Sequence, residues 1–461
     1  MPRIARALRS TAKRALRPVV RRLAPAPARL PPGLWELAPV PGGGLALAGH
    51  DLDALAARFG TPLHVLHAPR LDANVAALAG LEAFYSYKTH PVPAVLRRLH
   101  ARGVGAEVIS ELELDLALRL GVPPDRIIYN GPGKSDASLR TAIARGILLL
   151  NLNHAEELPR VARAARALGR KARVGIRANA RAGWSAQFGT AIAGGAALAL
   201  VEAALRTPEV EVVGLHSHRG ALLYVVADLD AFLAEVLAFT DLLHERLGFT
   251  PEILDLGGSL CVPTVRPLTS RDLRLARTFG VEISAPALAG RLTLGAYGAR
   301  VRESVGRHFG ERGRPPPRTV VELGRALTAN AQALLARVIT TRAAPDGPPY
   351  AILDAGINIA GLLCSERHEI FSVKRFGEPA TTRYRLAGPI CHLGDVIHHG
   401  RDLPRLADGD TLLIMDSGAY FEPDSTSFSF ARPGTVLLDG ARVELVRRPE
   451  TIDDIVSRDA V

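Results

Sequence analysis

Lys88 is the residue whose type and surroundings point most directly to covalent chemistry. Only five of the 57 basic residues in this 461-residue chain are lysines, and Lys88 alone among them lies in an apolar and aromatic run, residues 83–88 (AFYSYK). Burial in such a run would lower the pKa of the amine and leave more of it neutral. A neutral lysine amine can attack an aldehyde to form a Schiff base, whereas an arginine guanidinium cannot. We therefore expect Lys88 to anchor an aldehyde group.

Other residues able to hold a cofactor follow short apolar runs along the chain. Glu322 could bind a ring nitrogen and keep it protonated, and His218 could stack on a ring face. Gly257 and Gly258 could bind a phosphate through backbone amides, with Arg325 beside them as a counter-charge. The remaining polar residues at such positions are Glu107, Asn130, Asn151, Arg177 and His216. Each alone could be an ordinary polar residue at a strand end, but together the set indicates pyridoxal phosphate.

Eight apolar runs, separated by stretches of helical periodicity, predict the elements that position these residues. Eight strand-and-helix units over about 250 residues match a (β/α)8 TIM barrel, where functional residues gather at the carboxyl ends of the strands. An open doubly wound sheet is the less favoured alternative, because no GxGxxG motif follows the first strand. The predicted strands are residues 83–88, 106–110, 127–130, 147–151, 173–177, 212–216, 253–256 and 320–323.

The pattern of the sequence changes after about residue 335, where short β-rich runs replace the helical periodicity. We expect the barrel to occupy residues 49–333 and a mostly β domain to occupy 334–461, so the fold class is α/β plus β. Residues 33–48 also read as extended and are expected to join the β domain. The predicted β runs are residues 338–341, 350–353, 411–415, 435–438 and 442–446.

Residues 1–32 form a basic, proline-rich extension that we expect to be flexible. The first 30 residues contain nine arginines and lysines and no acidic residue, and the rest of the chain is close to neutral despite the net charge of +11. This distribution argues against a nucleic-acid partner. The alternatives for the extension are an organelle transit peptide and an amphipathic helix on a membrane surface.

The cellular setting is predicted from what the sequence lacks. No apolar stretch is long enough to span a membrane, and the leader has no secretory apolar region. The three cysteines are too few and too far apart for a zinc site or a disulfide framework. We therefore expect a cytoplasmic protein without a metal site.

Several motifs resemble those of the fold-type III pyridoxal-phosphate decarboxylases, which include diaminopimelate and ornithine decarboxylase. Residues 85–88 (YSYK) resemble the family's Schiff-base lysine motif, and residues 105–110 (GAEVIS) its second-strand signature. Residues 216–220 (HSHRG) resemble the motif whose second histidine stacks on the cofactor. Residues 255–258 (DLGG) and 322–325 (ELGR) resemble the phosphate loop and the Glu-Pro-Gly-Arg motif. The resemblance covers residues 55–450 and implies an alanine racemase-like barrel.

The resemblance also implies roles for individual residues. Lys88 would hold the cofactor as an aldimine, and Cys391, in residues 388–391 (GPIC), would protonate Cα after carbon dioxide leaves. His392, Asp395 and Tyr420 would contact the amino-acid substrate, and the active unit would be a homodimer whose subunits share active sites. The implied cofactor-binding residues are Lys88, Glu107, Arg177, His218, Gly257, Gly258, Glu322, Gly324, Arg325 and Tyr420.

Four positions depart from the family pattern and concern mainly the substrate. Ala221 stands where a serine is usual, Gln187 where a lysine is usual, and His392 where an acidic residue is usual. Apolar residues follow Gly356 in place of the Arg-Pro-x-x-Tyr run of diaminopimelate decarboxylases. We expect decarboxylation of an amino acid, with diaminopimelate as the named substrate and poor turnover of ornithine. The alternatives are a racemase on the same barrel and a catalytically silent pyridoxal-phosphate-binding homologue.

Overall fold

The computed structural model describes residues 15–20, 22–41, 43–181, 187–220, 222–345 and 347–460. The chain forms two compact units. The barrel unit comprises Leu71–Val262 and Ala289–Thr328, and the β unit comprises Met1–Arg70, Pro263–Leu288 and Ala329–Val461.

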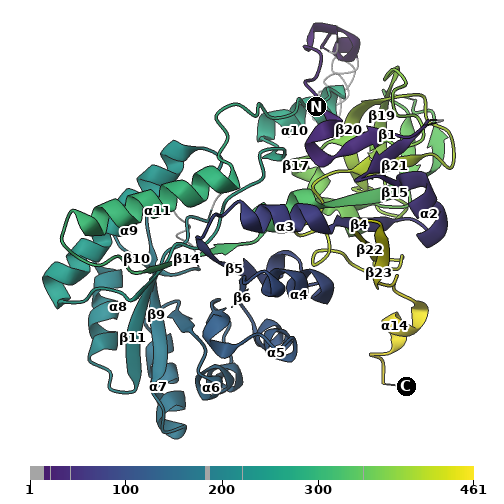
Figure 1. The fold of residues 1–461 in the computed structure, drawn as a ribbon. Coiled ribbons are helices and arrows are strands. Elements are labelled where there is room, and N and C mark those ends of the chain that lie inside the picture. Colours follow the sequence, from purple (N-terminus) through teal and green to yellow (C-terminus); the bar gives the residue numbers. More distant parts are fainter. Residues whose placement is uncertain are drawn as a thin grey trace, which may run out of the picture. The chain divides into compact units, whose positions relative to one another are not determined.

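The barrel unit is a closed ring of eight parallel strands with helices outside it (Figure 1). Each strand pairs with the next, and β14 pairs with β5 to close the ring. Every one of the eight predicted runs overlaps one of these strands, so the predicted barrel is confirmed. The strands are β5 (Glu82–Ser86), β6 (Gly105–Val108), β7 (Ile127–Tyr129), β8 (Leu149–Leu152), β9 (Ala172–Asn179), β11 (Val210–His216), β12 (Ile253–Asp255) and β14 (Arg318–Leu323).

Apolar side chains from several strands pack together inside the barrel. Phe84, Ile128, Leu149 and Val320 belong to one buried cluster. A Cβ at Gly214 would lie 2.7 Å from Leu149 Cδ1, so this strand position needs glycine to leave room for the leucine. The helices of this unit are α4 (Pro93–Ala101), α5 (Glu111–Arg119), α6 (Asp136–Arg145), α7 (Glu157–Ala167), α8 (Ala196–Leu205), α9 (Val226–Leu247), α11 (Leu294–Gly310) and α12 (Arg325–Thr328).

The β unit is built on a mixed sheet in which β15 (Gln332–Arg342) pairs with three other strands. Leu63, Leu335, Leu413 and Val436 pack in one of its two cores. The other strands of the sheet are β4 (Leu63–His67), β16 (Tyr350–Leu353), β18 (Ile370–Ser372), β19 (Thr382–Ala387), β20 (Val396–Leu403), β21 (Thr411–Ile414), β22 (Gly434–Asp439) and β23 (Arg442–Arg447).

The two units divide the chain differently from the predicted boundaries. Residues 49–70, 263–288 and 329–333, which the sequence placed in the barrel, belong to the β unit. The reason for the first difference is that β4 pairs with β15 and β22. The second segment contains α10 (Ser270–Phe279).

Residues 33–48 join the β unit by packing. Their strands β1 (Leu37–Pro39) and β2 (Leu45–Leu47) form a small separate sheet with β3 (His50–Asp51). Trp35 is buried in the same core as Leu63, and its Nε1 donates to Asp416 Oδ1 at 2.9 Å. The segment thus contributes side chains to this core.

The end of the predicted flexible extension is bound to the β unit. Arg29 donates to Glu282 Oε2 at 2.9 Å, and Leu30 is buried in the core. Arg29 thereby supplies the cationic partner that a buried carboxylate requires. Among the described helices, none is long and apolar enough to cross a membrane.

Candidate active site

Lys88 and Glu107 meet at the carboxyl ends of β5 and β6. Lys88 lies in a 3-10 turn (Tyr87–Thr89) directly after β5, and its Nζ is 3.2 Å from Glu107 Oε2. Ser86 donates to the same carboxylate oxygen. The Lys88 side chain is 40% exposed, so the burial assumed from the aromatic run is wrong. The amine is instead held by a buried carboxylate and stays accessible to a reactant.

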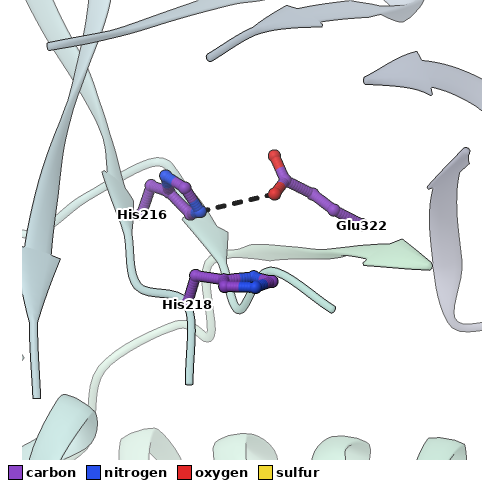
Figure 2. A group of neighbouring side chains, drawn as sticks. All are labelled: His216, His218 and Glu322. Atoms are coloured by element: carbon purple, nitrogen blue, oxygen red, sulfur yellow. Dashed lines mark ion pairs between the residues drawn. The ribbon is translucent and has the colours of Figure 1, made fainter. Parts of the chain in front are cut away.

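Glu322, on β14, is a buried carboxylate in the same mouth of the barrel. Its Oε2 lies 3.4 Å from His216 Nε2 (Figure 2). Its Oε1 accepts from Asn130 Nδ2 at 2.5 Å. Burial alone would raise the pKa of Glu322, but the charge of His216 and hydrogen bonds from His216 and Asp255 hold it below its usual value. Glu322 is therefore ionised, as a partner for a protonated ring nitrogen must be.

Asp255, at the end of β12, takes the opposite protonation state. Burial and the negative charge of Glu322 raise the pKa of Asp255 well above its usual value. Its Oδ1 accepts the backbone N–H of Gly257 at 2.9 Å. The pair of carboxyl groups thus carries one negative charge, located on Glu322.

His218 presents a neutral ring beside Glu322 (Figure 2). Its Nδ1 accepts the backbone N–H of Gly258 at 3.0 Å. The loss of water around the ring and the positive charge of Arg177 lower the pKa of His218 to about 3. A neutral flat ring is suited to stacking on an aromatic cofactor.

The glycines after β12 and β14 allow the backbone to pass close to neighbouring groups. A Cβ at Gly258 would lie 2.2 Å from the carbonyl oxygen of Glu322, and one at Gly324 would lie 2.1 Å from Thr89 Oγ1. Gly257 has φ of +61°, a left-handed conformation that favours glycine. Arg325 follows directly as the first residue of α12. These segments are compatible with a phosphate held by backbone amides and an arginine.

The donor set fits pyridoxal phosphate in a further respect. Arg177 Nε and Ser217 Oγ are buried and have no hydrogen-bond partner in the described part of the chain. Buried polar atoms of this kind are costly unless a ligand or water satisfies them. The amine of Lys88, the ionised Glu322 and these two donors match the aldehyde, ring nitrogen and polar substituents of the cofactor.

A buried network, which the sequence did not predict, supports the segment 187–189 near Arg177. Lys134 Nζ lies 3.2 Å from Glu157 Oε2, and both side chains are buried. Glu157 Oε2 accepts the backbone N–H of Asn153 at 2.7 Å, and Asn153 Oδ1 accepts that of Gly189 at 3.0 Å. The guanidinium of Arg177 lies 4.9 Å from the ring centroid of Phe188. The ion pair thus holds the segment that packs on a predicted cofactor residue.

Asn130 is another residue whose role the sequence did not define. Its Nδ2 donates both to Glu107 Oε1, at 2.9 Å, and to Glu322 Oε1. Its Oδ1 accepts from Asn151 Nδ2 at 2.8 Å. Both asparagines were candidates because they end strands, but only the folded barrel shows that Asn130 links the two carboxylates.

The remaining predicted residues belong to the β unit. Cys391 and His392 are exposed, and the His392 ring contacts Phe428 at a centroid distance of 6.5 Å. Tyr420 has a positive φ of 68°. Cys391 and His392 lie on the loop after β19, whereas Tyr420 follows β21.

Asp395, predicted to contact the substrate, is buried, and its two carboxylate oxygens accept the backbone N–H groups of Ile357 at 2.8 Å and Ile390 at 3.0 Å. These contacts brace the loop that carries Cys391. Ala221 lies outside the described residues. The backbone carbonyl oxygen of Gln187 accepts from Asn153 Nδ2 at 3.2 Å.

Comparison with known proteins identifies the family of this chain. Residues 69–329 match the family model described as pyridoxal-dependent decarboxylase, pyridoxal binding domain. A diaminopimelate decarboxylase of Pseudomonas aeruginosa is 31% identical over 90% of this chain and 96% of its own length. A diaminopimelate decarboxylase of Methanothermobacter thermautotrophicus is 28% identical over 90% of this chain and 95% of its own length.

Solved structures give the same result for the fold. The crystal structure of diaminopimelate decarboxylase from Methanocaldococcus jannaschii has a TM-score of 0.81 and 26% identity, covering 92% of this chain and 98% of that one. A lysine/ornithine decarboxylase from Vibrio vulnificus, at 24% identity and a TM-score of 0.68, covers 84% and 97% and shares the fold. The chain belongs to the pyridoxal-phosphate-dependent decarboxylase family.

Proposed function

We propose that this enzyme decarboxylates an amino acid of the diaminopimelate type, with Lys88 as the residue that binds pyridoxal phosphate covalently. The observation that carries the proposal is the position of Lys88 Nζ, 3.2 Å from Glu107, in a barrel mouth that also contains the ionised Glu322 and the neutral His218. When bound, the cofactor accepts the electron pair released as the bond between Cα and the carboxylate breaks.

Each residue of the barrel mouth has a proposed task. Glu107 orients the Lys88 amine for attack on the aldehyde, and Glu322 holds a proton on the ring nitrogen. His218 supports the ring face. Backbone amides at Gly257, Gly258 and Gly324, together with the Arg325 side chain, bind the phosphate, and Arg177 donates to a ring substituent.

The β unit supplies the proposed proton donor. The Cys391 thiol is exposed on a loop that Asp395 braces, and we assign it the protonation of Cα after carbon dioxide leaves. Tyr420 is assigned to the phosphate and His392 to the substrate. We further propose that a homodimer shares these groups between subunits.

The proposed substrate class is supported by the relatives. The similar proteins from Pseudomonas aeruginosa and Methanothermobacter thermautotrophicus are named diaminopimelate decarboxylases. A crystal structure of the Methanocaldococcus jannaschii relative contains L-lysine, which is diaminopimelate with one carboxylate removed. In this chain the segment after Gly356 is apolar, and Ile359 and Ala360 lie in the core of the β unit.

A panel of amino acids, assayed by carbon dioxide release and by the chirality of the recovered amino acid, tests the proposal. We expect carbon dioxide from meso-diaminopimelate and slow turnover of ornithine, because His392 replaces an acidic residue that would attract a distal ammonium group. Loss of chirality without carbon dioxide would identify a racemase instead. Neither reaction, with cofactor bound, would identify a silent homologue and overturn the proposal.

A further inference from the structure

The helix that precedes the proline-rich segment exposes an apolar stripe. Residues 15–20, 22 and 23 are helical, and Leu16, Val19 and Leu23 are 50%, 51% and 79% exposed. Spacings of three and four residues place these three side chains on one face of the helix. Exposed apolar residues that are grouped on one face, rather than scattered, mark a contact surface.

A different side of this helix contacts the body of the β unit. Arg17 Nε donates to the carbonyl oxygen of Thr278 at 2.8 Å, near the C-terminal end of α10. Adjacent residues of a helix point in directions about 100° apart, so the Arg17 side chain lies on a different side of the helix from Leu16. The contact that holds the helix therefore uses a basic residue, and within the described part of the chain the three apolar side chains stay exposed.

Positive charge is concentrated in the part of the sequence that contains this stripe. The first 30 residues contain nine basic residues and no acidic one. On α10, the helix that Arg17 contacts, Arg271, Arg274 and Arg277 are exposed at spacings of three residues. Because the rest of the chain is close to neutral, the first 30 residues hold most of the net positive charge of +11.

We propose that the N-terminal helix docks on an anionic lipid bilayer, with Leu16, Val19 and Leu23 inserted among the acyl chains and the arginines at the phosphate groups. A nucleic acid would use the charge but leave the apolar stripe exposed, whereas an anionic bilayer matches both features. The proposed contact involves only the face of this helix that carries Leu16, Val19 and Leu23. This inference goes beyond the proposed reaction and does not depend on it.

Co-sedimentation of the full-length enzyme with lipid vesicles tests this inference. We expect binding to vesicles with about 30 mol% phosphatidylglycerol, weak binding to pure phosphatidylcholine, and loss of binding as salt rises from about 0.05 M to about 0.5 M. The triple variant L16S/V19S/L23S should bind at least about tenfold more weakly because it removes the apolar contribution. The double variant R22Q/R274Q should also bind more weakly, by roughly fivefold for each arginine.

The matched control replaces exposed apolar residues of the barrel unit. L112S/L205S removes two such side chains, 77% and 43% exposed, and should bind vesicles as the unaltered enzyme does. All variants should keep their carbon dioxide release or cofactor absorbance, which shows that they fold. No binding to anionic vesicles at low salt, or equal binding by L16S/V19S/L23S, would overturn the inference. So would binding to duplex DNA that is as tight as binding to vesicles and insensitive to the apolar substitutions.

Discussion

Glu322 illustrates how the barrel keeps a buried carboxylate charged. Water is excluded from it, yet His216 at 3.4 Å and the hydrogen bond from Asn130 stabilise the anion, while Asp255 keeps its proton. Two neighbouring carboxyl groups whose pKa values move apart are typical of acid–base sites. The different protonation states of Glu322 and Asp255 depend on burial and on contacts between residues at the ends of β7, β11, β12 and β14.

The first prediction follows from that charge. Glu322→Gln removes the anion that holds a proton on the ring nitrogen, so kcat should fall by about 10²-fold or more while the cofactor still binds. The measurement is carbon dioxide release together with cofactor absorbance. Glu252→Gln, at an exposed position beyond the opposite end of β12, is the matched control and should leave kcat unchanged. An unaltered kcat in Glu322→Gln would contradict the assigned role.

Glu113 gives a prediction about pH and stability. Burial and the nearby charge of Glu107 raise the pKa of Glu113 to about 7 in the folded protein, against 4.5 when unfolded. Between pH 4.5 and about pH 7 the folded protein therefore binds more protons than the unfolded chain. As pH rises through this range, ionisation of Glu113 lowers the free energy of unfolding. The loss is on the order of 3 kcal/mol above pH 7. Glu113→Gln avoids this loss because it stays neutral.

The expected result is a pH-dependent gain in melting temperature. Glu113→Gln should melt higher than the unaltered enzyme at pH 8, and the difference should shrink as pH falls toward the unfolded value of 4.5. Glu111→Gln, an exposed position in the same turn, should show no such trend. A difference that grows as pH falls would mean that the pKa of Glu113 shifts in the other direction.

At the scale of elements, the Lys134–Glu157 pair links the loop after β7 to α7. Both side chains are buried, and Glu157 also fixes Asn153, which holds residues 187–189. Removing one member of a buried ion pair leaves the other without compensation and typically costs about 3–5 kcal/mol. The pair therefore contributes to stability and to the position of Phe188 over Arg177.

The corresponding prediction compares single and double variants. Lys134→Met should lower the free energy of unfolding by about 3–5 kcal/mol, and adding Glu157→Gln should restore part of it because no buried charge remains. Denaturant unfolding measures both. Hydrogen exchange at residues 187–189 should rise in Lys134→Met. Additive losses in the double variant would show that the two side chains do not form an energetic pair.

Most elements were predictable because their residues alternate between apolar runs and helical spacing. The eight barrel strands follow from such runs, yet β4 has the same apolar character and pairs with β15 and β22 of the β unit. Strand composition does not specify the partner. The strand β20 was missed because its sequence, VIHHGRDL, is rich in polar residues, although Arg401 is fully buried against Glu282. Only tertiary contacts explain a buried arginine there.

At the scale of the whole molecule, the sequence indicated many of the candidate site residues but not the contacts between them. Lys88, Glu107, His218 and Glu322 were found from their places at strand ends. The bridge made by Asn130 and the brace made by Asp395 depend on chain segments far apart in sequence, so no local pattern encodes them. The proposed sharing of active sites between subunits likewise depends on how two chains assemble, which a local sequence motif does not specify.

Mixed oligomers provide the prediction at this scale. Lys88→Ala and Cys391→Ala should each be inactive alone, because one lacks the cofactor amine and the other the proton donor. If two subunits share each site, co-expression in equal amounts should restore about one quarter of full activity, since half of the dimers contain one intact site. Co-expression of Lys88→Ala with Cys261→Ala is the control for mixing. Activity no higher than that of the parents would contradict shared sites.

The most direct measurement is chemical identification of the residue that binds the cofactor. The enzyme is loaded with pyridoxal phosphate, reduced with borohydride and digested, and the labelled peptide is sequenced by mass spectrometry. We predict one label, on Lys88, with neither label nor carbon dioxide release in Lys88→Ala, while Lys171→Ala, at an exposed lysine, retains both. A label on another lysine, or undiminished carbon dioxide release by Lys88→Ala, would contradict the account.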